Sequence, residues 1–154
     1  MSMLTRRSTY TRVPTPLAAV GFLLAFVAVC LLLAGRKVEG LRPELLLELA
    51  PTFYSHVYNF GLSYLCVAGI GYPWLMMGVP MRKVALLGAA AIVLNLLYEG
   101  LLPILNTRDM VDAVYGVVGA VLGLLLLCAI DRWWMRPAPV ATSAPAGSDD
   151  ASPG

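Results

Sequence analysis

The sequence predicts an all-α integral membrane protein, with four transmembrane helices in a small bundle and one short interfacial helix. Of its 154 residues, 59% are hydrophobic and 13% are charged, and the mean hydropathy is +0.77. Soluble domains have about 45–50% apolar and about 25% charged residues, and a chain of this size cannot bury such an excess in its own core. The apolar residues also gather in four runs, separated by charged or Pro-containing segments. The lipid bilayer is therefore the expected partner.

The first apolar run, residues 17–35, follows a polar segment, residues 1–16, that contains three arginines. About 20 residues are needed for a helix to cross a hydrocarbon core of about 30 Å. Basic residues before an apolar run also describe a signal peptide, but the apolar region of a signal peptide has only about 7–15 residues. Because this run is longer and Arg36 and Lys37 follow it directly, we expect an uncleaved first span.

A charged linker, residues 36–52, separates the first two spans, and its middle from Pro43 to Ala50 has the composition of a short helix. Such a helix is too short and too charged to cross a bilayer, so we expect it to lie along the interface. The second span covers residues 53–79. Its first residues are polar, and Pro73 near its end predicts a kink.

The third and fourth spans cover residues 84–105 and 110–130. The third carries Asn95 and Glu99, which are four residues apart and therefore share one face of a helix. The last segment, residues 137–154, consists mainly of Pro, Ala, Ser, Gly and Asp, a composition that predicts a disordered cytoplasmic tail.

The positions of Lys and Arg predict the orientation, because cytoplasmic segments carry an excess of these residues. Alternating spans place the two groups of basic residues at opposite membrane faces. One face holds Arg6, Arg7, Arg12, Arg82, Lys83, Arg132 and Arg136, and the other holds Arg36, Lys37, Arg42 and Arg108. Both termini are therefore expected in the cytoplasm.

The same alternation brings polar residues from three spans and one loop to a single layer at the outer face. Glu99 lies about 24 Å along the third span from Lys83, at a rise of about 1.5 Å per residue. Ionisable groups inside a membrane are costly and indicate functional sites. The candidate ligand-binding residues are His56, Asn59, Glu99, Arg108, Asp109 and Asp112.

Each candidate also has a purely structural interpretation. Arg108, Asp109 and Asp112 also fit a solvated turn in which Asp109 caps the fourth span. His56 also fits an amphipathic residue at the interface. Small residues at spacings of three and four are typical of helix packing in lipid, and this is the interpretation that we adopt for Gly116, Gly119 and Gly123 of the fourth span.

These motifs resemble the VanZ-like family of small bacterial membrane proteins. The resemblance covers roughly residues 56–123 and is carried by Glu99, Arg108, Asp109, Asp112, Gly119 and Gly123, with His56, Phe60 and Tyr64 in the earlier span. Two positions depart from the family pattern. Leu102 stands where the family usually has Gln or a similar polar residue, and Gly116 stands where it commonly has Asn. The resemblance implies a multi-pass protein of the bacterial cytoplasmic (inner) membrane and the cell envelope.

The leading hypothesis is a VanZ-like envelope protein whose outer polar layer binds a lipid or a cell-wall-related group. One alternative is a membrane enzyme that uses His56 with Glu99 or Asp112 as an acid–base pair on a lipid-linked substrate, although no nucleophile is recognisable. A proton- or ion-coupled carrier, and a structural or assembly subunit without a small-molecule site, are further alternatives. A homo-oligomer or a membrane partner protein is compatible with each of these hypotheses.

Other classes of function have little support in the sequence. A net charge of +2, with no basic stripe, argues against nucleic acid as a partner. Cys30, Cys66 and Cys128 lie in separate apolar runs without metal-ligand spacing, so we expect no cofactor, no metal site and no disulfide. Buried, inert thiols are the expected state of these three cysteines.

Overall fold

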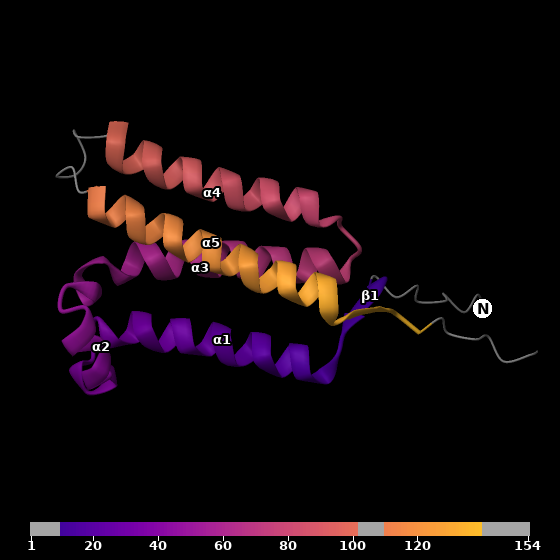
Figure 1. Ribbon diagram of the computed structural model, residues 1–154, viewed down its shortest axis with the longest axis horizontal. Coiled ribbons are helices and arrows are strands. Elements are labelled where there is room, and N and C mark those ends of the chain that lie inside the picture. Colours follow the sequence, from indigo (N-terminus) through magenta and orange to yellow (C-terminus); the bar gives the residue numbers. More distant parts are fainter. Residues whose placement is uncertain (1–9, 102–109, 140–154) are drawn as a thin grey trace, which may run out of the picture.

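The computed structural model describes residues 10–101 and 110–139, of which residues 99–101 are described by their backbone alone. The described chain is mostly helical, and its long helices run side by side and alternate in direction along one axis (Figure 1). The elements are the strands β1 (Arg12–Pro14) and β2 (Met135–Pro137), the 3-10 helix η1 (Glu39–Leu41), and the α-helices α1 (Pro16–Gly35), α2 (Glu44–Leu49), α3 (Phe53–Met76), α4 (Met81–Leu101) and α5 (Met110–Trp133).

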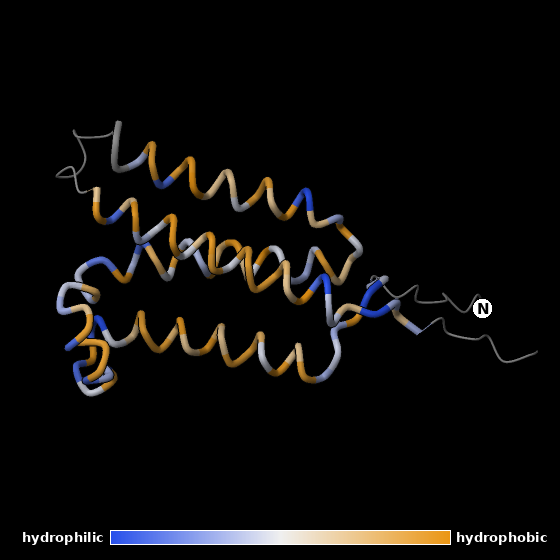
Figure 2. Tube along the Cα trace, viewed as in Figure 1, coloured by the Kyte–Doolittle hydropathy of each residue, from blue (hydrophilic) through white to orange (hydrophobic). Residues whose placement is uncertain are grey.

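Among the described residues, three segments are long and apolar enough to cross a membrane: Pro16–Gly35, Met81–Tyr98 and Met110–Trp133. Their mean hydropathies are 2.9, 1.5 and 2.5, and the hydropathy trace is hydrophobic along their middle sections (Figure 2). The structure thus supports a helical membrane protein with three of the four expected spans. Helix α3, which covers the second expected span, is not among these segments, because the mean hydropathy along it is too low.

The position of α3 accounts for polar residues that it carries. It packs against α1, α4 and α5, and its buried residues extend from Tyr54 in the first turn to Leu75 in the last. Nine of its 24 residues are buried, compared with three of 20 in α1 and seven of 24 in α5. A central helix can carry His56 and Ser63, because neighbouring helices supply the hydrogen-bond partners that lipid cannot supply.

The closest helix pair is α3 with α5, and glycine makes their approach possible. A Cβ atom on Gly119 would overlap the backbone carbonyl oxygen of Phe60 in α3. One turn later, a Cβ on Gly123 would lie 3.3 Å from the carbonyl oxygen of Tyr64. Small residues let helix backbones approach closely, and here they place the start of α5 beside the start of α3.

The linker between α1 and α3 folds back onto the end of α1. The Arg42 guanidinium donates hydrogen bonds to the carbonyl oxygens of Gly35 (2.8 Å) and Arg36 (3.2 Å). These carbonyls lie at the C-terminus of α1, where they have no partner within the helix. Helix α2 occupies the segment in which the sequence predicts an interfacial helix, and its Leu45 and Leu49 are exposed.

The opposite end of the bundle is closed by a contact that the sequence did not indicate. Strands β1 and β2 pair antiparallel, with Val13 opposite Arg136, and Arg12 forms an ion pair with Asp131. We call these two strands the terminal clasp. Strand β2 includes Pro137, the first residue of the expected tail, while residues 1–9 and 140–154 lie outside the described residues.

Several helix boundaries differ from those predicted. Helix α3 ends at Met76 rather than near residue 79, because the chain turns at Gly78, which has a φ of 80°. Helix α4 begins at Met81, directly after Pro80, rather than at residue 84. The predicted burial of the cysteines is wrong: Cys30, Cys66 and Cys128 are all exposed on the helix surfaces. An apolar run alone does not reveal which of its residues face outward.

Candidate functional site

The first turns of α3 and α5 bring His56 and Asp112 together. The His56 Nδ1 atom lies 2.7 Å from the Asp112 Oδ1 atom, and the two side chains are only 14% and 22% exposed. They are 56 residues apart in the sequence. The Gly119 contact with Phe60 places the two helices close enough for this bond. The hydrogen bond joins a ring nitrogen to a carboxylate oxygen at one end of the bundle.

Aromatic rings hold the His56 imidazole in place. The Tyr115 ring stacks on His56 with centroids 5.3 Å apart and also contacts Phe53, 5.8 Å away. A carboxylate on Nδ1 fixes the orientation of the imidazole ring. The pair therefore has the geometry of an oriented acid–base group.

A second polar contact joins α4 to α3. The Asn95 Nδ2 atom donates to Ser63 Oγ and to the Ala91 carbonyl oxygen, both at 2.8 Å. Ser63 is buried. The Asn95 side-chain oxygen lies against Gly116 of α5, where a Cβ would overlap it. Asn95 thus contacts all three helices at one level of the bundle.

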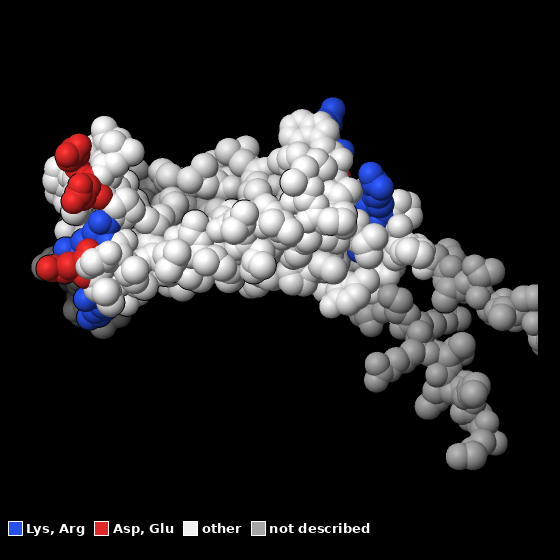
Figure 3. Space-filling view, turned by 90° about the horizontal axis from the view of Figure 1, so that it is seen from below, with Lys and Arg blue, Asp and Glu red and all other residues white. Residues whose placement is uncertain are grey.

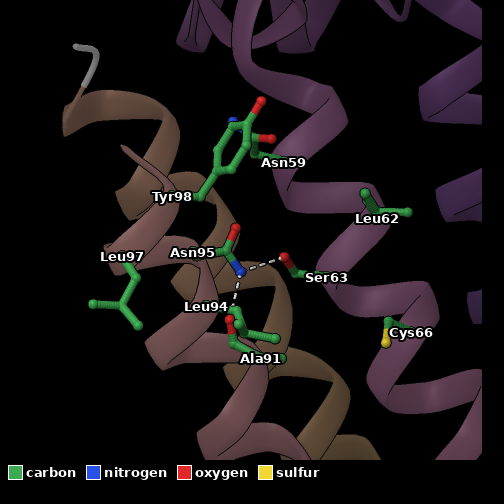
Figure 4. A pocket seen from close by; sticks show the side chains of 9 residues that line it. All are labelled: Asn59, Leu62, Ser63, Cys66, Ala91, Leu94, Asn95, Leu97 and Tyr98. Carbon is green, nitrogen blue, oxygen red and sulfur yellow. Dashed lines mark hydrogen bonds between the residues drawn. The ribbon is translucent and has the colours of Figure 1, made fainter. Parts of the chain in front are cut away.

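A groove of about 700 Å³ lies between α3 and α4 beside this contact. Two of its lining residues, Leu62 and Leu94, are 66% and 65% exposed, so the groove opens to the side of the bundle. Its volume is within the range of about 300–1,000 Å³ for small-molecule sites. We call it the α3–α4 groove; it is lined by Asn59, Leu62, Ser63, Cys66, Ala91, Leu94, Asn95, Leu97 and Tyr98 (Figure 4).

The polar side chains of the groove are concentrated toward the α2 end of the bundle. Asn59 precedes Ser63 by one turn of α3, and Asn95 donates to Ser63 from the facing helix (Figure 4). Within residues 10–101 and 110–139, the Asn59 carboxamide forms no side-chain hydrogen bond. Below Ser63 the lining becomes apolar, through Cys66 and Ala91. The groove is therefore amphipathic along its length.

Of the residues expected in one polar layer, the structure describes the side chains of His56, Asn59 and Asp112. His56 and Asp112 meet between α3 and α5, whereas Asn59 lines the α3–α4 groove. Glu99 lies in the last turn of α4, and nothing is described of its side chain. Arg108 and Asp109 lie outside the described residues.

Sequence reasoning missed Ser63 and did not assign Asn95 a site role. The spacing held a usable signal, since Asn59 and Ser63 are four residues apart and His56 lies three residues before Asn59. Residues at such spacings share one face of a helix. A polar stripe on an otherwise apolar helix would have indicated Ser63. Its partner on another helix is not encoded in that periodicity.

The described part of the chain contains no group of three or more His, Cys, Asp or Glu residues that could hold a metal ion. Comparisons with protein-family models, curated proteins and solved structures find no match.

Proposed function

We propose that this chain is a four-span, VanZ-like envelope protein that binds a lipid in the α3–α4 groove. The observation that carries this proposal is the groove itself, which is open on its side, largely apolar and polar at one end. A lipid has the same division between acyl chains and a polar part. Leu62 and Leu94 at the opening would offer its chains a direct route from the bilayer.

The packing of the helices supports α3 as the fourth span. Its 24 residues equal the length of α5, and the two helices pack against each other along the bundle. At about 1.5 Å per residue, both are about 36 Å long, which is enough to cross the hydrocarbon core. Neighbouring helices supply partners for His56 and Ser63, so that α3 can cross the bilayer with a lower hydropathy.

The distribution of charge supports an orientation with the terminal clasp in the cytoplasm. Basic residues gather at the clasp end, whereas acidic and basic residues are mixed around α2 (Figure 3). The clasp end of the described chain carries Arg12, Arg82, Lys83, Arg132 and Arg136, and the α2 end carries Arg36, Lys37 and Arg42. By the positive-inside rule, His56, Asp112 and the polar end of the groove then face outward in a bacterial inner membrane.

The test is to fill the groove while leaving the helix intact. Leu94→Trp places a large side chain at the groove opening, and Leu86→Trp is its matched control. Leu86 is on the same helix, is 68% exposed and does not line the groove. The proteins would be reconstituted in phosphatidylcholine nanodiscs with a brominated diacylglycerol, and retained lipid would be measured by native mass spectrometry.

We expect the unmodified protein and the Leu86→Trp variant to retain the brominated lipid, and Leu94→Trp to lose it. Equal retention by all three proteins would exclude the groove as the lipid site. Far-ultraviolet circular dichroism would verify that both variants keep their helical content.

The oriented His56–Asp112 pair favours a second candidate, an enzyme that acts on a lipid-linked substrate by acid–base chemistry. General bases contribute about 10²–10⁴-fold to catalysis when they are positioned on the reacting group. The lipid profile of producing cells separates the two candidates. An enzyme would change that profile in a manner lost in His56→Ala, whereas a binding protein would leave the same lipid species in both strains.

A further inference from the structure

The chemistry of the α3–α4 groove restricts the lipid that it can take. This inference rests on the proposed function and names the class of ligand. Apart from the Cys66 thiol, the polar groups in the described lining are carboxamides or hydroxyls: Asn59, Ser63, Asn95 and Tyr98. The nine described lining residues include no Lys, Arg or His and no carboxylate. The described part of the groove therefore offers hydrogen bonds without a formal charge.

The hydrogen-bonding groups in the groove are not equally occupied. Both protons on Asn95 Nδ2 are used, one by Ser63 and one by the Ala91 carbonyl. In the described part of the chain, the Asn59 carboxamide keeps both its donors and its acceptor available to a ligand. An amide is costly to place in an apolar environment without a partner. A ligand group that both donates and accepts would remove that cost.

Two ionisable side chains at the α2 end of the bundle, His56 and Arg36, are engaged with other residues. On α3, one turn before Asn59, His56 is bonded to the Asp112 carboxylate. The Arg36 guanidinium lies over the Tyr58 ring, 4.5 Å from its centroid. A phosphate in the groove would lack a cation in the described lining. Burying an unpaired charge is far more costly than burying a hydroxyl.

We propose that the groove selects a lipid with an uncharged, hydroxyl-bearing polar part, of the diacylglycerol class, over anionic phospholipids. Its hydroxyl and ester groups lie against Asn59 and the Asn95–Ser63 contact. Its acyl chain follows the apolar part of the groove, past Cys66 and Ala91. The lipid enters from the bilayer between Leu62 and Leu94.

The test uses two probes that differ by one phosphate. Diacylglycerol and phosphatidic acid, each with the same photoreactive acyl chain, would be added separately to the full chain in phosphatidylcholine nanodiscs. After illumination, mass spectrometry would locate and quantify adducts on the peptides of α3 and α4. Leu94→Trp and its control Leu86→Trp establish whether an adduct comes from the groove.

We expect the diacylglycerol probe to label groove residues about tenfold more strongly than phosphatidic acid, a ratio that corresponds to about 1.4 kcal/mol. Asn59→Leu should reduce diacylglycerol labelling about tenfold, as expected for the loss of one hydrogen bond. Asn59→Lys adds a cation at the same place and should shift the preference toward phosphatidic acid.

The outcomes separate the two proposals. Groove labelling by phosphatidic acid that equals or exceeds that by diacylglycerol overturns the selectivity and leaves lipid binding intact. Labelling that is unchanged in Leu94→Trp, or absent from both helices with both probes, overturns the proposed function itself. Diacylglycerol labelling that is unaffected by Asn59→Leu overturns the role given to Asn59.

Discussion

The Asn95 carboxamide lies directly against Gly116, where a β-carbon would overlap its side-chain oxygen. This relationship links the helix contact to the groove, because the same amide donates to Ser63. Residue 116 must be small for Asn95 to keep its place between the three helices. The contact therefore makes α5 part of the framework of a groove that it does not line.

Gly116→Ala should weaken the bundle and disturb the groove. The added methyl group forces Asn95 away from Ser63, and overpacking of this kind costs about 1–3 kcal/mol. We expect a lower melting temperature in detergent and weaker lipid retention. The control is Gly21→Ala in α1, where a Cβ meets nothing within 4 Å; this variant should be neutral or slightly more stable, because Ala has the higher helix propensity. Equal melting temperatures for the two variants would contradict this prediction.

Gly119→Ala should be more damaging than Gly123→Ala. At Gly119 the obstacle is the Phe60 backbone carbonyl, which cannot move without displacing α3. At Gly123 the added Cβ atom would lie 3.3 Å from the Tyr64 carbonyl oxygen, and a small shift of the backbone relieves this contact. We expect Gly119→Ala to fail to assemble or to unfold at a much lower temperature, as measured by thermal size-exclusion chromatography. A milder effect at Gly119 than at Gly123 would be incompatible with the close α3–α5 approach.

The contribution of the His56–Asp112 bond to stability can be measured with a double-mutant cycle. The variants His56→Ala, Asp112→Ala and their combination would be unfolded reversibly in mixed micelles. A hydrogen bond to a charged group contributes about 1.5–3 kcal/mol, and we expect a coupling energy in this range. A coupling energy near zero would show that the two residues act independently in solution.

The Arg12–Asp131 ion pair of the terminal clasp should contribute much less. Its side chains are 33% and 23% exposed, and solvent-accessible pairs give about 0.2–1 kcal/mol. Arg12→Gln, Asp131→Asn and the double variant should show a small coupling energy that decreases as salt is added, because salt screens exposed charges. A large coupling that is independent of salt would refute this account of the clasp.

Thiol labelling can decide between four and three spans. In a background with Cys30, Cys66 and Cys128 replaced by Ala, single cysteines at Lys37 and Lys83 would be treated with a membrane-impermeant maleimide. If α3 crosses the membrane, position 37 should react in intact cells and position 83 only after permeabilisation. Reaction at both positions in intact cells would show that α3 does not cross the membrane, so that only three helices span it. Reaction at position 83 alone would invert the proposed orientation.

Properties that depend on local sequence could be predicted well. The lengths of the apolar runs indicated α1, α4 and α5, and the composition of the segment from Pro43 to Ala50 indicated the short helix α2. Helix geometry also placed Asp112 and His56 in the first turns of their helices. These features follow from residues near one another in the chain and from the fixed rise of an α-helix.

The tertiary structure decided which polar groups meet. Helix order and rotation bring His56 to Asp112, separate Asn59 from that pair, and set Asn95 between Ser63 and Gly116. These contacts depend on the close approach of backbones at Gly119, which no periodicity in a single helix specifies.

The terminal clasp and the outward-facing cysteines also depended on the fold. Each strand of the clasp has only three residues, and Arg12 and Asp131 are 119 positions apart. A three-residue strand is too short to show an alternating hydrophobic pattern. The two strands pair because the bundle brings β1 and β2 together. The sequence by itself determined where helices form and which segments suit lipid. The tertiary structure determined the partners of each polar group, because hydrogen bonds act over about 3 Å, whereas these residues lie far apart in the chain.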